Sequence, residues 1–242
     1  VQSASVQVSK KHIQSGKAQA VLMTSGNANA ATGIQGIRTL ENMCSVVAKE
    51  LNISPDAVLA AQTGLIGIQL NREIAVNGCS KAAQIVSDNG GSLAAHAIMT
   101  TDTVPKIELE QIELDGEIVT IGAMAKGAAM LSPAMATMLS LLTTDANVTS
   151  QALRLMLQNA MRPSFHSMVV DGCRSTNDTV IILANGQAKN NIIENEQSPG
   201  YKELSIAITK VCKSLAMQMA RDAEGATKFM LVTVKNALNN ED

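Results

Sequence analysis

The segment KGAAMLSPAMATMLSLLTTD, residues 126–145, is the most informative part of this chain. The 18 residues between Lys126 and Asp145 carry no charge, and five of them bear a hydroxyl group. A membrane-spanning helix needs about 18 or more predominantly apolar residues, and this segment has too many hydroxyls and helix breakers to form one. Pro133 disfavours helix in the residue before it. We therefore expect a strand-to-helix junction, where a loop delivers Thr137 to the start of a buried helix.

Thr137, at the centre of this segment, is a candidate nucleophile. A threonine hydroxyl is weakly nucleophilic unless a base lies beside it or its own α-amine is free. A free α-amine has a reference pKa of about 7.7 to 8.0, so it can accept the proton near neutral pH. That chemistry requires cleavage before Thr137, and Ala136 is small enough to let the hydroxyl approach its carbonyl. From the residues alone, a helix hydroxyl bonded back to the preceding turn is the favoured interpretation.

The composition is that of a globular protein and excludes several classes of function. The 242 residues are 46% hydrophobic, which allows a sizeable core in one large domain or two small ones. Only three residues are aromatic, which argues against base-stacking platforms for nucleic acids. Nineteen basic and 21 acidic residues give a net charge of -2, without a basic run that binds polyanions. We expect small-molecule chemistry, with no nucleic-acid or membrane partner.

The cysteines and histidines do not form a pattern typical of a metal site. They are scattered along the chain as Cys44, Cys79, Cys173, Cys212, His12, His96 and His166. We therefore expect no metal. The first residues also lack the apolar core of an export signal, so reduced thiols in a cytoplasmic protein are expected.

Helical and extended patterns alternate along the chain. Apolar residues at helical spacing predict helices over residues 38–51, 150–161 and 201–221. Residues 106–123 alternate like a β-hairpin around an Asp-Gly turn. A final strand is predicted over residues 228–235. This mixture predicts an α/β (α+β) layered fold.

Two turns of small residues follow apolar segments. The turn at Thr63 and Gly64 offers backbone N–H groups and a hydroxyl that suit an oxyanion hole, where one donor contributes about 2.7 to 4 kcal/mol. The turn at residues 26–33 lacks the GxGxxG spacing and the lysine of phosphate loops, so nucleotide binding is not expected. Lys126 can pair with a substrate carboxylate and Glu224 with a substrate amine. A solvated lysine and a polar turn residue are the ordinary alternatives.

Six motifs, taken together, resemble one family. In chain order they are GNANAATG (26–33), QTGLIG (62–67), TTDTVPK (100–106), KGAAMLSPAMATMLSLLTTDA (126–146), STNDT (175–179) and EGATK (224–228). The set covers nearly the whole chain and resembles ornithine acetyltransferase, also called glutamate N-acetyltransferase. Because such a set is far more specific than any one glycine turn, the resemblance favours a catalytic Thr137 over a structural one.

The resemblance implies a precursor that cleaves itself between Ala136 and Thr137. An α-chain region, residues 1–136, and a β-chain region, residues 137–242, would stay associated as parts of one enzyme. Thr137 would take acetyl from N2-acetyl-L-ornithine as an acyl-enzyme and pass it to L-glutamate in arginine biosynthesis. The assembly would be an αβ heterodimer or an α2β2 heterotetramer. No cofactor is implied, although acetyl-CoA as a second acetyl donor is left open.

The resemblance also implies the other site residues and the fold. Thr63 and Gly64 would form the oxyanion hole. The implied substrate-binding residues are Thr100, Lys126, Thr137 and Glu224. Lys126 suits the α-carboxylate common to both substrates, and Glu224 suits the cationic side chain of ornithine. The family fold is a layered sandwich of central sheets with outer helices, the ornithine-acetyltransferase/DmpA-like architecture.

Two alternatives to the transferase are left open. One is a self-cleaving aminopeptidase or amidase of the same nucleophile class, with water as the acceptor. The other is an inactive, truncated homologue that acts as a binding subunit. The sequence departs from the family pattern at Ala31, Ala129, Ala134 and Cys173-Arg174, where cysteine, glycine, asparagine and Asp-Thr or similar are usual.

Overall fold

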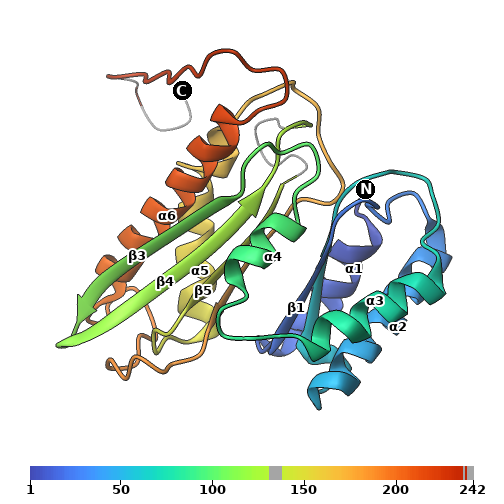
Figure 1. Cartoon of the computed structure of the whole chain (residues 1–242). Helices are drawn as coiled ribbons and strands as arrows, with labels where there is room; N and C mark the ends of the chain where they lie inside the picture. Colours follow the sequence, from blue (N-terminus) through green and yellow to red (C-terminus); the bar gives the residue numbers. More distant parts are fainter. Residues whose placement is uncertain (131–137, 237, 239–242) are drawn as a thin grey trace.

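The computed structural model describes residues 1–130, 138–236 and 238, and these form two sheets with helices outside them (Figure 1). The smaller sheet is the parallel pair β1 (Ala20–Thr24) and β2 (Val58–Gln62). The larger sheet has the order β3 (Lys106–Leu114), β4 (Glu117–Lys126), β5 (Leu139–Thr144) and β6 (Thr179–Ala184). The expected layered α/β (α+β) fold is confirmed.

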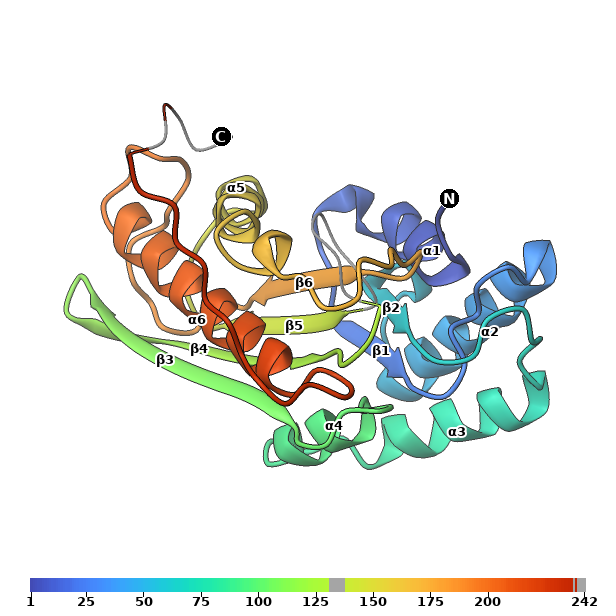
Figure 2. The same cartoon turned by 90° about the horizontal axis from the view of Figure 1, so that it is seen from above.

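Two helices pack on the smaller sheet, and a third packs on one of these helices (Figure 2). They are α1 (Ala4–His12), α2 (Gly33–Leu51) and α3 (Arg72–Gln84). Leu40, Met43 and Val47 are buried on one face of α2, at the spacing that aligns side chains on a helix. They share a core with Val8 of α1 and Val58 of β2. The predicted helix over 38–51 is confirmed, although it begins earlier.

The helices α5 (Ser150–Met161) and α6 (Tyr201–Arg221) pack on each other and on the larger sheet. Both have the bounds that helical spacing predicted. The predicted hairpin is β3 and β4, which pair antiparallel from Lys106 with Ala125 to Leu114 with Glu117. A shorter helix, α4 (Gly91–Ala97), contacts these two strands from the other side (Figure 1). Single 3₁₀ turns occur at Ile13–Ser15, Pro55–Ala57 and Phe165–Ser167.

The segment that begins at residue 139 is a strand, so the expected buried helix after Thr137 is wrong from residue 139 onward. β5 pairs antiparallel with β4 and parallel with β6. A short apolar run is compatible with a helix or a buried strand. The two neighbouring strands decide for the strand here, because they bond the backbone of β5 on both sides.

The strand predicted over residues 228–235 is also absent from the structure. This segment has no regular structure, and Met230, Val232 and Val234 are exposed. Its alternating pattern finds no neighbouring strand among the described residues, and a strand needs a partner for its backbone groups. Among the described residues, no helix is both long and apolar enough to cross a bilayer.

Candidate active site

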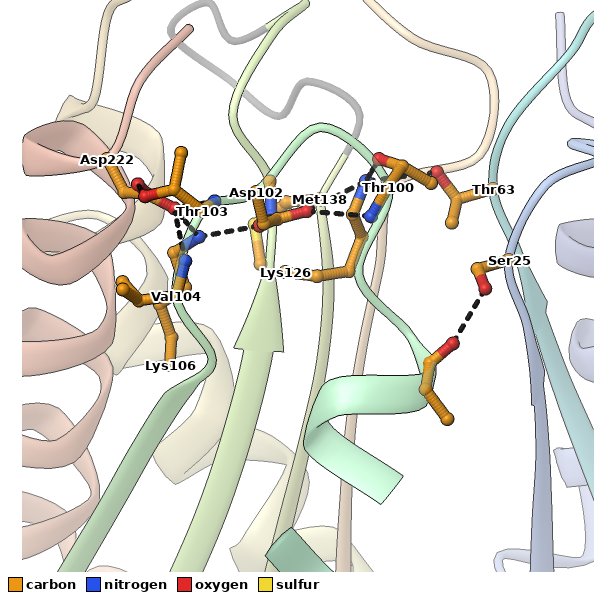
Figure 3. A network of polar contacts seen from close by, with 12 residues as sticks. Ser25, Thr63, Thr100, Asp102, Thr103, Val104, Lys106, Lys126, Met138 and Asp222 are labelled. Carbon is orange, nitrogen blue, oxygen red and sulfur yellow. Dashed lines mark hydrogen bonds and ion pairs between the residues drawn. The ribbon is translucent and has the colours of Figure 1, made fainter. Parts of the chain in front are cut away.

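Lys126 brings three of the predicted site residues together (Figure 3). It is the last residue of β4, and only 3% of its surface is exposed. Its Nζ donates to Thr100 Oγ1 at 2.8 Å and to Thr63 Oγ1 at 3.3 Å. Thr63 follows β2 of the smaller sheet, and Thr100 lies in the loop between α4 and β3. The ammonium therefore joins the ends of both sheets.

The two threonine hydroxyls keep their own protons available for other acceptors. A lysine ammonium has donors only, so Thr63 and Thr100 act as acceptors toward Lys126. The Thr63 backbone N–H is occupied, because it donates to Thr24 O at 3.0 Å. Of the donors expected at this turn, the hydroxyl of Thr63 and the N–H of Gly64 have no acceptor among the described residues and can serve a ligand.

Gly64 occupies a position that only glycine fits. Its φ of +129° lies in the left-handed region, and an added Cβ would stand 2.2 Å from Gly26 C and 2.5 Å from Asn27 N. Within the described part of the chain, no group accepts a hydrogen bond from the Gly64 N–H. The close approach of the Gly26–Asn27 backbone thus restricts the conformation of Gly64, whose N–H directly follows Thr63 in the chain.

Asp102 accepts hydrogen bonds from several groups around Lys126, a role that the sequence analysis did not predict. Its Oδ1 accepts from Gly127 N at 2.8 Å and from Lys106 Nζ at 2.6 Å. Its Oδ2 accepts from Thr100 N at 3.1 Å and lies 3.8 Å from Lys126 Nζ. One buried carboxylate therefore orients both Thr100 and the end of β4. The i,i+4 pair Asp102 and Lys106 within TTDTVPK was the available signal.

The charges in this cluster oppose one another. Burial lowers the pKa of Lys126, the positive charge of Lys106 lowers it further, and the negative charge of Asp102 opposes both. Burial alone would raise the pKa of Asp102. Hydrogen bonds from Lys106, Gly127 and Thr100, with the charge of Lys126, outweigh that effect and hold the pKa below its usual range.

The ion cluster continues to the end of α6. Lys106 is fully buried, and its Nζ contacts Asp222, the residue that caps α6. Asp222 also accepts from the backbone N–H of Thr103 at 2.9 Å and from the Thr103 hydroxyl. Burial alone would raise the pKa of Asp222, but the bonds from Lys106 and Thr103 lower it to about 2. The carboxylate is therefore ionised at neutral pH.

The backbone of Glu224 is bonded to the segment that follows β4 of the larger sheet. Its N–H donates to Ala128 O at 2.6 Å, so the turn after α6 is attached to the chain two residues beyond Lys126. The Glu224 side chain is exposed. The structure thus brings Thr63 and Thr100 into direct contact with Lys126, and it connects Glu224 to Ala128, two residues beyond Lys126, through one backbone hydrogen bond.

The first residue of β5 lies next to Lys126. Leu139 pairs with Lys126 across the β4–β5 ladder. The N–H of Met138 donates to Asp178 Oδ1 at 3.0 Å. Burial raises the pKa of Asp178 to about 6, although hydrogen bonds from Met138 and Ser175 act in the opposite direction. Asp178 belongs to the STNDT motif, and sequence reasoning gave it no role.

The expected nucleophile, Thr137, and the expected cleavage site after Ala136 lie outside the described residues, as does Ala134. Met138 is the residue directly after Thr137 and is the first described residue beyond it.

Comparison with known proteins identifies the family. A family model described as the ArgJ family matches residues 1–242. The chain belongs to the ArgJ family. The resemblance to ornithine acetyltransferases that the six motifs suggested is thereby confirmed, and it covers the whole chain.

Named relatives within the ArgJ family are similar along the full length of this chain. "Arginine biosynthesis bifunctional protein ArgJ" of Symbiobacterium thermophilum is 46% identical over 242 residues, which are 100% of this chain and 60% of that protein. The protein of the same name from Synechocystis sp. is 40% identical, with 100% and 58% covered. The chain thus spans about three fifths of the length of these curated relatives.

A solved ArgJ structure resembles this one. The crystal structure of the arginine biosynthesis bifunctional protein from Bacillus halodurans has a TM-score of 0.51 and 34% sequence identity. The similarity covers 55% of this chain and 70% of that one. The layered fold described above is therefore the fold of an ArgJ protein.

Among the described residues of this ArgJ chain, no group of three or more His, Cys, Asp or Glu side chains is arranged to hold a metal ion. The Lys126 ammonium contacts two hydroxyls, with the Asp102 carboxylate behind it, and the Gly64 N–H directly follows Thr63 in the chain. The ammonium, the hydroxyls and the N–H are donors that suit an anionic ligand or a developing oxyanion.

Proposed function

We propose that this ArgJ-family chain belongs to an enzyme that transfers acetyl from N2-acetyl-L-ornithine to L-glutamate in arginine biosynthesis. The Lys126 ammonium, positioned between the hydroxyls of Thr63 and Thr100, supports the proposal most directly. It offers a carboxylate anchor beside a pair of oxyanion donors. The relatives named for arginine biosynthesis support the choice of substrates.

Cleavage between Ala136 and Thr137 prepares the nucleophile. The Thr137 hydroxyl attacks the Ala136 carbonyl, and the peptide C–N bond breaks, which frees the α-amine of Thr137 and leaves Ala136 as an ester on the Thr137 oxygen. Water then hydrolyses this ester, which frees the Thr137 hydroxyl and leaves Ala136 with a carboxylate. The α-chain region, 1–136, and the β-chain region, 137–242, then stay together. The paired strands β4 and β5 support this association, because they lie on opposite sides of the cut.

In the first half-reaction the free α-amine takes the proton of the Thr137 hydroxyl. The oxygen attacks the acetyl carbon of N-acetylornithine and forms a C–O bond. The Thr63 hydroxyl and the Gly64 N–H stabilise the oxyanion, a contribution of about 2.7 to 4 kcal/mol for one such donor. The amide C–N bond then breaks, the proton passes to the leaving nitrogen, and ornithine departs.

In the second half-reaction the α-amine of glutamate attacks the acetyl ester. A C–N bond forms, the C–O bond breaks, and the proton lost by the nitrogen returns to the Thr137 oxygen. Lys126 binds the α-carboxylate that both substrates share, with Thr100 beside it. Glu224 contacts the side-chain ammonium of ornithine, a charge-assisted bond.

We extend the proposal to the assembly and to a second donor. The relatives are named bifunctional, which supports a second activity, and acetyl-CoA fits as another acetyl source for glutamate. The two regions form an αβ heterodimer or α2β2 heterotetramer in the cytoplasm.

Mass spectrometry of the protein in its full natural length tests the mechanism. The wild type should yield fragments that end at Ala136 and begin at Thr137, and Thr137→Ala should stay intact. An uncut wild type with full acetyl transfer refutes it. Turnover of N-acetylornithine that releases acetate and does not respond to glutamate would show a hydrolase instead.

A further inference from the structure

The turn that carries Glu224 is held at two points. The N–H of Glu224 donates to Ala128 O at 2.6 Å. Two residues earlier, Asp222 accepts from the backbone N–H groups of Thr103 and Val104, at 2.9 Å and 3.4 Å, and contacts the ammonium of Lys106. The position of the exposed Glu224 side chain therefore depends on how firmly Asp222 is bound.

A chain of buried charges connects this turn to Lys126 (Figure 3). It runs from Lys126 to Asp102, then to Lys106 and Asp222, and the side chains of all four are at most 9% exposed. Two positive and two negative charges alternate along it, so each ammonium lies next to a carboxylate. Such buried pairs fix geometry because an unpaired partner is costly.

The two ends of this series of charges lie at or near the two side chains that are candidates to bind one substrate molecule. Lys126 is the candidate for the α-carboxylate of either substrate. Glu224 is the candidate for the side-chain ammonium, which N-acetylornithine has and glutamate lacks. The distance between the Lys126 and Glu224 side chains matters only for a substrate that contacts both of them.

We infer that Asp222 and Lys106 are positioning residues that set the place of Glu224 relative to Lys126, and thereby determine recognition of the diamino acid substrate. This inference rests on the proposed function. Asp102 lies nearer to Lys126 and serves both substrates, whereas Asp222 serves the one that carries a side-chain ammonium.

Steady-state kinetics on the protein in its full natural length test the inference. In a double-displacement reaction, kcat/KM for N-acetylornithine reports the first half-reaction and kcat/KM for glutamate the second. Their ratio does not depend on the fraction of enzyme that is folded. For Asp222→Asn the ratio is expected to fall about tenfold, which corresponds to about 1.4 kcal/mol.

The chain offers a matched control. Lys210 and Glu110 also join α6 to β3, at 2.8 Å, but this pair is at the surface. Lys210→Met should leave the ratio within about twofold of the wild type, because surface pairs contribute little. Thr103→Val is the milder second variant, since it removes only the hydroxyl contact with Asp222. It should lower the ratio in the same direction.

The outcomes separate the inference from the proposed function. An unchanged ratio in both Asp222→Asn and Thr103→Val, or an equal loss for both substrates, overturns the positioning role. A Thr137→Ala variant that still transfers acetyl overturns the proposed function instead. A ratio that falls in both variants but not in Lys210→Met supports the inference.

Discussion

The carboxylate of Asp102 accepts a hydrogen bond from the backbone N–H of Gly127 at 2.8 Å. This bond fixes the end of β4 to the loop that follows α4. Because Lys126 directly precedes Gly127, its ammonium is held where the Thr63 and Thr100 hydroxyls can accept from it. Three segments of the chain therefore meet at one buried ion pair.

Replacement of Lys126 by methionine is expected to weaken the binding of both substrates. The ammonium is the only part of Lys126 that can bind a carboxylate, and truncating one partner of a buried charge pair costs about 2 to 5 kcal/mol. We expect kcat/KM to fall by roughly 30-fold or more for N-acetylornithine and for glutamate. Asp102 keeps its bond of 2.6 Å to Lys106, so the variant should fold. A loss confined to one substrate contradicts the shared carboxylate anchor.

Replacement of Gly64 by alanine is expected to displace the N–H group that we propose as an oxyanion donor. The new Cβ would stand 2.2 Å from the Gly26 backbone, so the Gly64 N–H must move. We expect kcat to fall by about 100-fold to 1,000-fold, as for the loss of one oxyanion donor.

Gly67→Ala is the matched control for Gly64→Ala. Gly67 also has positive φ, +80°, but an added Cβ would meet nothing within 4 Å. This control should cost about 1 kcal/mol of stability with little change in kcat. Equal kcat values in the two variants would show that backbone strain, and not the donor, matters at position 64.

Much of this site was visible in the sequence, but its organisation was not. The motifs pointed to Thr63, Thr100 and Lys126, and the structure brings those three side chains together. The bounds of α5 and α6 followed from helical spacing because each buries a single apolar face. Such local patterns need no knowledge of distant segments.

The features that the sequence did not predict depend on contacts between residues far apart along the chain. Asp102 acts on Gly127, 25 positions away, and Asp222 acts on Thr103, 119 positions away. The apolar run at residues 139–144 became β5 because strands lay on both sides of it. Pattern and spacing describe neighbours along the chain, so they carry no information on these pairings.

Acid unfolding should report the bond between Lys106 and Asp222. The folded-state pKa of Asp222 is about 2, below its ordinary value of 3.8, because Lys106 and Thr103 bond to its carboxylate. Its contribution to stability is therefore present above about pH 4 and is lost as the pH falls toward 2. Asp222→Asn should be less stable than the wild type at pH 7, and the difference should shrink toward pH 2. A difference that stays constant over this range contradicts the assignment.

Asp178 is expected to have the opposite effect on stability. Burial raises its folded-state pKa to about 6 from the ordinary value of 3.8, so folding favours the protonated carboxyl. The resulting stabilisation is present below about pH 4 and is lost as the pH rises through 6. The difference between these two pKa values corresponds to about 3 kcal/mol.

Asp178→Asn tests this effect because asparagine keeps an oxygen that can accept from the Met138 N–H but does not ionise. We expect the Tm of the variant, relative to the wild type, to rise between about pH 4 and pH 6 and to level off above that. Thermal unfolding at half-unit pH steps measures the difference, and carboxylates common to both proteins cancel. A relative Tm that does not change with pH would mean that Asp178 ionises as freely in the folded protein as in the unfolded chain. The bond to Met138, next to the proposed nucleophile, would then be a bond to a solvated carboxylate.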